Sequence, residues 1–312
     1  MTNKKLHDED DDQLYFQKEY LEHLQKQDIK FVLDHQCQIF LTLTSHFSNI
    51  HIDMIKSKTK HDYFPKSVPS IVHGNGGVES KMFLSKLCNY IPLKQYREYK
   101  KETNQGKVLF LIRIHELYSD NYENIFNQNY PKELSKYLFY GKNAPHSELI
   151  SFMKENSINY YVVNSNSTMK NLLITLFNNK EYDYYFLGDT SQMITDVDLT
   201  MKLISTGKSV IAPMLLGNGK TNFWSDLQPN NFFTVGWDHD DILERKIKGI
   251  WYVPCFKGTV MISRNRIPDI IKAMNKYSGG DCDFDIYFST ALIVRYVFIH
   301  LINIEEYGYL LF

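Results

Sequence analysis

A run of almost purely apolar residues near the middle of the chain limits the fold more than any other feature. Residues 108–114 read VLFLIRI, which leaves almost no polar side chain to face water on either side. A strand buried on both faces of a parallel sheet has this character, whereas a strand with one solvent face alternates polar and apolar residues. We therefore expect Val108–Ile114 to form a central, parallel strand.

More strand-like and helix-like segments follow this run in alternation. The strand-like segments are Tyr137-Leu-Phe-Tyr, Tyr160-Tyr-Val-Val, Tyr184-Tyr-Phe-Leu and Val210-Ile-Ala-Pro, and the helix-like segments between most of them are 148–155, 168–177 and 197–206. Strands that alternate with helices form βαβ units around a mostly parallel sheet. The sequence therefore predicts the α/β class, with a Rossmann-type sheet in a domain over residues 108–312.

The first third of the chain has a looser pattern. Residues 13–27 have helical spacing, short strand-like segments follow, and a glycine-rich stretch begins at His73. Residues 94–107 read KQYREYKKETNQGK, a polar and charged stretch typical of a linker. We expect a smaller N-terminal α/β segment over 1–93, a linker over 94–107, and then the larger domain.

Charge and hydropathy exclude several classes of function. Lys and Arg number 35 against 36 Asp and Glu, so there is no basic excess that would favour nucleic-acid binding. Residues 1–12 lack the apolar stretch of a secretory signal, and no stretch reaches the ~18 apolar residues of a membrane span. We expect a cytoplasmic protein. The Asn-, Lys-, Ile- and Tyr-heavy composition is typical of an AT-rich genome, for example a viral one.

The cysteines do not indicate a metal site. Cys37, Cys88, Cys255 and Cys282 are widely spaced and form no CxxC pair, which disfavours zinc. Free thiols are the favoured state, although the even count also permits disulfides. A His-x-Asp match at His51 lacks the downstream His and Arg of a non-haem iron site, so we expect no Fe(II) and no 2-oxoglutarate.

A carboxylate stands at the end of one predicted strand. Asp189 follows Tyr184-Tyr-Phe-Leu-Gly, and ligands of open α/β sheets bind beyond the carboxyl ends of the strands. A carboxylate there can hold a divalent cation that neutralises a pyrophosphate. Such a side chain packs against little, so Asp189→Ala is expected to leave the fold intact. The alternative is that Asp189 only caps a turn.

Other polar and aromatic residues are weaker candidates. Lys170, beside Asn171 near a predicted helix start, could reach an anion or simply be solvated. Trp224, which follows Asn222 closely, and Trp251 could stack on a sugar from the two sides of one cleft, or they could be core residues. Asp283 and Asp285 could both face one pocket, where one of them would accept a proton from an attacking hydroxyl, or they could be solvated surface charges.

Nine ordered segments together resemble the procollagen lysyl hydroxylase/glycosyltransferase family. The segments that resemble the end of its first glycosyltransferase domain are Asp12-Gln-Leu-Tyr-Phe, Leu33-Asp-His-Gln-Cys-Gln-Ile-Phe40, His73-Gly-Asn-Gly76 and Asn89-Tyr-Ile-Pro92. Those that resemble its accessory domain are Tyr184-Tyr-Phe-Leu-Gly-Asp189, Val210-Ile-Ala-Pro-Met214, Thr221-Asn-Phe-Trp-Ser-Asp-Leu227, Gly249-Ile-Trp-Tyr-Val-Pro254 and Asp283-Phe-Asp285. The resemblance covers nearly the whole chain, and only the ordered set is specific.

The resemblance implies a GT-A-like fold that binds a UDP-sugar with manganese, and a collagen-like acceptor. It implies glucose transfer to galactosyl-hydroxylysine, with the family's hydroxylase domain absent after Phe312. The implied metal ligands are Asp189 and His73, and the implied catalytic residues are Asp285 and Asp189. The implied nucleotide-sugar-binding residues are Lys170, Asn171, Asp189 and Ser191, and the implied acceptor-binding residues are Asn222, Trp224, Trp251 and Asp283.

One departure from the family pattern keeps two functions open. The accessory domain usually carries Asp-x-Asp at the strand end, but this chain has Asp189-Thr190-Ser191, and a serine hydroxyl is a poorer manganese ligand than a carboxylate. The first hypothesis is a glycosyltransferase that modifies hydroxylysine or galactosyl-hydroxylysine. The alternative is a non-catalytic accessory or collagen-binding module with a degenerate site. Either protein could assemble as a homo-oligomer.

Overall fold

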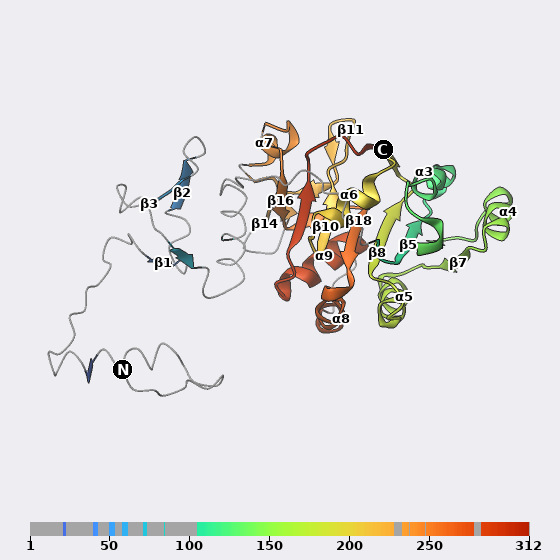
Figure 1. Ribbon diagram of the computed structural model, residues 1–312, viewed down its shortest axis with the longest axis horizontal. Coiled ribbons are helices and arrows are strands. Elements are labelled where there is room, and N and C mark those ends of the chain that lie inside the picture. Colours follow the sequence, from blue (N-terminus) through green and yellow to red (C-terminus); the bar gives the residue numbers. More distant parts are fainter. Residues whose placement is uncertain are drawn as a thin grey trace. The chain divides into compact units, whose positions relative to one another are not determined.

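The computed structural model describes residues 105–227, 233–236, 238–246, 248–277 and 282–311, with the short pieces 21–22, 40–42, 50–53, 58–61, 71–73 and residue 84 (Figure 1). The chain forms two compact units, Met1–His73 and Gly74–Phe312. The predicted linker 94–107 lies largely outside the described residues, so the predicted domain boundaries stay a prediction. Within the described residues, no helix is both long and apolar enough to cross a bilayer.

The described part of the first unit consists mainly of short strand pairs. Strand β1 (Phe40–Thr42) pairs in parallel with β4 (Ile71–His73), and β2 (Ile50–Asp53) pairs antiparallel with β3 (Lys58–His61). His73 is the last residue of β4, and its side chain is exposed. The glycines that follow it lie outside the described residues.

The second unit is built on an eight-stranded sheet with the order β16-β19-β10-β18-β8-β5-β6-β7. The bounds are β5 (Val108–Arg113), β6 (Ser135–Gly141), β7 (Asn159–Val162), β8 (Tyr184–Asp189), β10 (Val210–Pro213), β16 (Ile250–Val253), β18 (Val260–Ser263) and β19 (Ile299–Ile302). Strands β18 and β16 run antiparallel to their neighbours, and the other pairings are parallel. The predicted α/β class with a mostly parallel sheet is confirmed.

The apolar run that opens the domain occupies the predicted place. Strand β5 lies between β6 and β8 and pairs in parallel with both along its full length. Residues 108–112 are at most 2% exposed. Phe110 stacks on Tyr137 of β6 with ring centroids 4.7 Å apart and contacts Phe186 of β8 at 5.2 Å. These rings contribute to one continuous core on the sheet.

Helices connect the strands as the alternation predicts. The α-helices are α3 (Tyr122–Phe126), α4 (Ser147–Glu155), α5 (Asn166–Asn178), α6 (Leu199–Ser205), α7 (His239–Leu243), α8 (Ile267–Lys276) and α9 (Phe284–Val294). The shorter 3₁₀ helices are η2 (Glu116–Asn121), η3 (Lys132–Leu134) and η4 (Arg264–Arg266). Ser165 caps α5 by accepting from the Thr168 N–H, and Asp283 caps α9 by accepting from the Asp285 N–H.

Short strands form several small sheets in addition to the main sheet. Their bounds are β9 (Gln192–Ile194), β11 (Leu216–Gly217), β12 (Lys220–Thr221), β13 (Phe223–Trp224), β14 (Asp226–Leu227), β15 (Phe233–Thr234), β17 (Cys255–Phe256) and β20 (Gly308–Leu310). Four of them form a sheet in the order β12-β11-β20-β9, while β13 pairs with β17 and β14 with β15.

Cys255 and Cys282 are free thiols, as expected; the other two cysteines lie outside the described residues.

Candidate functional site

A cavity of about 1340 Å³ opens at the carboxyl ends of the parallel strands β5, β6 and β8. The last residues of these strands, Arg113, Gly141 and Asp189, line it. The segments 142–146, 163–166 and 282–284 supply more of its wall. An open α/β sheet binds its ligands at this end, because loops and helix starts surround the strand ends there. The cavity therefore lies where the sequence predicts a site.

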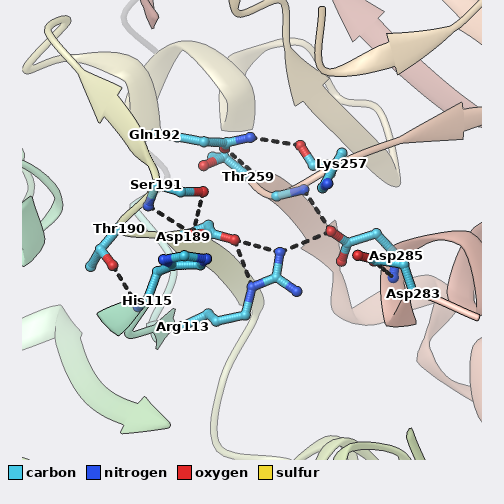
Figure 2. A network of polar contacts seen from close by, with 11 residues as sticks. Arg113, His115, Asp189, Thr190, Ser191, Gln192, Lys257, Thr259, Asp283 and Asp285 are labelled. Carbon is cyan, nitrogen blue, oxygen red and sulfur yellow. Dashed lines mark hydrogen bonds and ion pairs between the residues drawn. The ribbon is translucent and has the colours of Figure 1, made fainter. Parts of the chain in front are cut away.

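A partly buried arginine that lines the cavity joins two carboxylates (Figure 2). Nε of Arg113 donates to Oδ2 of Asp189 over 2.6 Å. Nη2 contacts the same oxygen and donates to Oδ2 of Asp285 over 3.0 Å. The side chains are 24%, 4% and 11% exposed for Arg113, Asp189 and Asp285. We call these three residues the guanidinium bridge.

Further donors hold the two carboxylates of the guanidinium bridge. Oδ1 of Asp189 accepts from the backbone N–H of Ser191 over 2.8 Å and from its hydroxyl over 2.7 Å. Oδ2 of Asp285 accepts from the Gly258 N–H over 3.0 Å. Gly258 has φ of +82°, and a Cβ there would lie 2.2 Å from the Gln192 side chain, so any other residue would be strained at this position. Both carboxylates are thus fixed by backbone as well as by charge.

Burial and the neighbouring charges shift the pKa of each group in the guanidinium bridge. Burial alone would lower the pKa of Arg113, but Asp285 and Asp189 outweigh it and raise the pKa well above its ordinary value. Burial would raise the pKa of Asp189, but the Arg113 charge and the Ser191 hydrogen bonds lower it overall. Burial raises the pKa of Asp285, only partly opposed by Arg113. Arg113 and Asp189 are therefore charged at neutral pH.

The rest of the cavity wall mixes charged and polar groups. Lys142 follows β6, Lys257 follows β17, and both line the cavity. Asp283 also lines it and is exposed. Nδ2 of Asn166, at the start of α5, donates to the Cys282 carbonyl over 2.7 Å and so joins two parts of the wall. The cavity thus presents cations suited to an anionic ligand, and a carboxylate that can accept a proton.

The residues around Asp189 do not fit a divalent metal ion. Such an ion needs several oxygen ligands, whereas both Asp189 oxygens already accept hydrogen bonds and a permanent cation lies beside them. Within the described residues, no group of three or more His, Cys, Asp and Glu could hold a metal. The predicted role of Asp189 as a metal ligand therefore stays a prediction, which these contacts do not favour. His73 belongs to the other unit, and its predicted role stays a prediction.

The structure brings some predicted site residues to the cavity and leaves others elsewhere. Asp189, Ser191 and Asp283 line it, and Asp285 adjoins it through Arg113. Lys170 and Asn171 of α5 are not among the lining residues, whereas Asn166 and Met169 of the same helix are. The start of α5, rather than Lys170 and Asn171, thus faces the cavity, and the predicted nucleotide contacts of these two residues stay a prediction.

Three residues that were predicted to bind the acceptor, Asn222, Trp224 and Trp251, do not line the cavity. Each of them is buried or half-buried in the fold. Trp251 is 1% exposed, and its Nε1 donates to Oδ1 of Asn303 over 2.9 Å. Asn222 is 1% exposed and bonds the chain's own backbone, accepting from Leu215 N–H and donating to the carbonyl of residue 213. Trp224 is half-buried and is not part of the cavity wall. The prediction that the two tryptophans line one cleft is therefore wrong for Trp251, which is a core residue.

The sequence contained a signal for one of the three cavity cations that were not predicted, Arg113, but not for Lys142 or Lys257. Arg113 interrupts the apolar run of β5, and a charge at the end of a buried strand requires a partner or a ligand. Lys142 and Lys257 gave no such signal, because solvated lysines are common. Asp189 was also misjudged as packing against little, since it is 3% exposed and hydrogen-bonded through both oxygens.

Two family models match the chain. The model described as "PLOD GT domain" matches residues 1–102, and the model described as "Glycosyltransferase family 25, N-terminal domain" matches residues 109–312. Procollagen-lysine,2-oxoglutarate 5-dioxygenase 1 of Gallus gallus is 26% identical over 97% of this chain and 46% of its own length. The multifunctional procollagen lysine hydroxylase and glycosyltransferase LH3 of Rattus norvegicus is 24% identical over 98% and 45%. The chain thus spans less than half the length of these curated relatives.

Solved glycosyltransferase structures are more distantly similar. GalNAc-T7 with UDP, GalNAc and Mn²⁺ is 10% identical with a TM-score of 0.44, and the match covers 64% of this chain and 43% of that one. Staphylococcus aureus TarS 1-349 in complex with UDP-GlcNAc is 11% identical with a TM-score of 0.42, over 65% and 58%.

Proposed function

Because this chain belongs to glycosyltransferase family 25 and to the procollagen lysyl hydroxylase/glycosyltransferase family, we propose that it transfers a sugar, glucose first among the candidates, from a UDP-sugar to hydroxylysine or galactosyl-hydroxylysine of a collagen-like polypeptide. The observation that carries the proposal is the cavity at the carboxyl ends of β5, β6 and β8, with cations and carboxylates in its wall. The substrates are inferred from the names of the relatives.

The size and charge of the cavity support a nucleotide-sugar donor. Ligand pockets commonly measure about 300–1,000 Å³, so a cavity of about 1340 Å³ has room for a nucleotide-sugar and part of an acceptor. Arg113, Lys142 and Lys257 would stabilise the diphosphate as its negative charge grows during departure. The residues around Asp189 do not fit manganese, so no step of this proposal depends on a metal.

Among the three aspartates Asp189, Asp283 and Asp285, Asp283 is best placed to accept the acceptor's proton. It lines the cavity and is exposed, while Asp285 and Asp189 are engaged by Arg113. In the proposed reaction the acceptor hydroxyl oxygen forms a bond to the anomeric carbon, and its proton passes to Asp283. The bond from that carbon to the diphosphate breaks, and UDP leaves with the electron pair. Asp285 and Asp189 are positioning residues that hold Arg113.

A UDP-release assay with identified products tests the proposal. The chain is incubated with UDP-glucose, and separately with other UDP-sugars, together with collagen-like peptides that carry hydroxylysine or galactosyl-hydroxylysine. We expect UDP release that depends on the peptide, and a peptide that gains the mass of one hexose. Peptide-independent UDP release, or none with any donor, would contradict the proposal.

A matched pair of variants assigns the proton acceptor. Asp283→Asn retains a side chain that can cap α9, so we expect it to fold and to bind UDP but to lose most turnover. The control is Asp269→Asn, which changes an exposed carboxylate paired with Arg266 on α8 and should leave turnover unchanged. Full turnover in Asp283→Asn would exclude Asp283 as the base.

The guanidinium bridge also favours a second function, that of a non-catalytic accessory or collagen-binding module. Arg113 engages both carboxylates that the sequence assigned to catalysis. Calorimetry separates the two functions, because the accessory module would bind a collagen-like peptide without binding UDP. Binding of UDP with catalytic turnover would exclude it.

A further inference from the structure

We propose that Arg113 is a built-in substitute for a divalent cation: its guanidinium occupies the position between Asp189 and Asp285, excludes Mn²⁺ from that pair and makes nucleotide binding in the cavity independent of metal. The nucleotide part of this inference rests on the proposed function. The metal part does not, and it is tested with the metal alone.

Steric overlap is the first reason for the exclusion. A hard divalent ion lies about 2.0–2.6 Å from its oxygen ligands. Nη2 of Arg113 contacts Oδ2 of Asp189 and lies 3.0 Å from Oδ2 of Asp285. An ion that joined these two oxygens would have to occupy nearly the same point as Nη2. The metal and the guanidinium therefore cannot both bridge this pair.

The backbone keeps Arg113 at this position. As the last residue of β5, it is opposite Asp189 of β8 and Tyr140 of β6 in the parallel registers, so the sheet fixes its Cα on both sides. A rotation of the side chain away from the bridge would leave Asp189 and Asp285 facing each other, buried and without a counter-charge. Guanidinium also keeps its charge at every physiological pH, so no change of protonation vacates the position.

Charge is the second reason for the exclusion. One guanidinium already offsets part of the negative charge of the two carboxylates, and it repels an approaching cation. Lys142 and Lys257 add positive charge elsewhere in the cavity wall. A diphosphate would thus meet cations that belong to the chain, without an ion carried in with it. Binding of this kind weakens as salt is added, because part of the lysine charge is open to solvent.

A titration with Mn²⁺ alone tests the exclusion. Electron paramagnetic resonance counts free Mn²⁺ as it is added to the parent chain, to Arg113→Met and to Arg266→Met. Arg266 is the matched control, an exposed arginine in an ion pair with Asp269. Only Mn²⁺ that is no longer bound after Asp189→Asn is counted as bound at the guanidinium bridge. This criterion separates it from Mn²⁺ bound elsewhere on the chain. We expect no such ion in the parent or in Arg266→Met. One ion should appear in Arg113→Met and be lost again in Arg113→Met with Asp189→Asn.

The parent alone can overturn the proposal. One ion bound by the parent and lost in Asp189→Asn would show that Arg113 does not exclude the metal. Circular dichroism checks that Arg113→Met is folded, and a folded variant that gains no ion would also overturn it. If that variant does not fold, the comparison of the parent with Asp189→Asn still decides the point.

A second measurement uses only the parent chain and UDP. We expect the Kd for UDP to agree within about twofold in EDTA and in Mn²⁺. A Kd that is about tenfold lower with Mn²⁺ would overturn metal independence. Absence of UDP binding under both conditions would contradict the proposed function, while the Mn²⁺ titration would still decide the role of Arg113.

Discussion

Two buried polar networks at strand ends of the same unit differ in charge and in access to solvent. The guanidinium bridge consists of three ionisable groups, and Arg113 is 24% exposed at the cavity. The second network centres on Asn303, which follows β19 and is 0% exposed. Its Oδ1 accepts from Gly249 N–H over 2.7 Å and from Trp251 Nε1 over 2.9 Å, and its Nδ2 donates to the Ile242 carbonyl over 2.9 Å. We call this the Asn303 network.

The difference indicates which network serves the fold and which serves a ligand. The Asn303 network is neutral and its donors and acceptors pair with one another, so it contributes stability without needing anything from solution. The guanidinium bridge holds charges in a buried position beside a cavity. Such an arrangement contributes less to stability than apolar packing would, which makes it a candidate for function. The variants below test this division.

The largest expected effect is that of Trp251→Ala. Removal of a fully buried indole should lower the free energy of unfolding by about 3–5 kcal/mol, because a cavity remains in the core. Urea denaturation measures the loss, and UDP titration of the folded variant should give the parent Kd. The control Trp224→Ala removes a half-buried indole and should cost less. A small loss of stability in Trp251→Ala, accompanied by lost ligand binding, would make Trp251 a site residue after all.

The second-largest effect is expected for Asp189→Ala, which should lower the free energy of unfolding by about 3 kcal/mol. This value is at the lower end for a broken buried ion pair, because Asp285 still pairs with Arg113. The Ser191 N–H would also lose its acceptor. This reverses the sequence-based expectation that the substitution leaves the fold intact. The control is Asp269→Ala, an exposed pair that should cost at most about 1 kcal/mol. Equal denaturation midpoints for the two variants would show that the guanidinium bridge adds no stability.

Asn303→Ala should cost about 1–3 kcal/mol, since it leaves the Gly249 N–H and the Trp251 indole N–H buried without an acceptor. UDP binding should not change. A double-mutant cycle with Trp251→Phe isolates the indole hydrogen bond, and the two losses should not be additive. The exposed Asn275→Ala in α8 serves as the control and should change little. Additive losses in the cycle would contradict the coupling of Asn303 to Trp251.

The smallest expected effect is a pH dependence in the half of the sheet that contains the Asn303 network. Burial, together with the charge of Lys208, lowers the pKa of His300 in β19 to about 4. The unfolded chain has a His pKa of about 6.5, so it binds more protons than the folded chain between these values. His300 therefore stabilises the fold fully above about pH 6.5, and this contribution is lost as the pH falls toward 4.

Urea denaturation at pH 5 and pH 7.5 measures this effect. The free energy of unfolding of the parent should be about 1 kcal/mol lower at pH 5 than at pH 7.5; this figure is reduced for solvent screening because His300 is only partly buried. In His300→Gln the difference between the two pH values should be smaller. The exposed His115→Gln should retain the parent's dependence. An unchanged pH dependence in His300→Gln would assign the effect to other groups.

The sequence alone determined the scaffold of the second unit. The apolar run of β5 predicted a central parallel strand because side chains on both faces of such a strand are buried, and this is a local property of the residues. The alternation of strands and helices predicted a mostly parallel sheet, because such alternation forms βαβ units. Asp189 was located correctly at the cavity, since strand ends of an open sheet converge at one edge.

Only the tertiary structure decided which partners these residues have. Arg113 and Asp285 are 172 positions apart, and their contact depends on how the start of α9 packs against the end of β5. Likewise, Trp251 became a core residue because β16 pairs with β19, which brings its indole to Asn303. Local periodicity determines which face of an element is apolar, whereas the packing of distant elements determines whether a charge meets a metal, a ligand or another side chain.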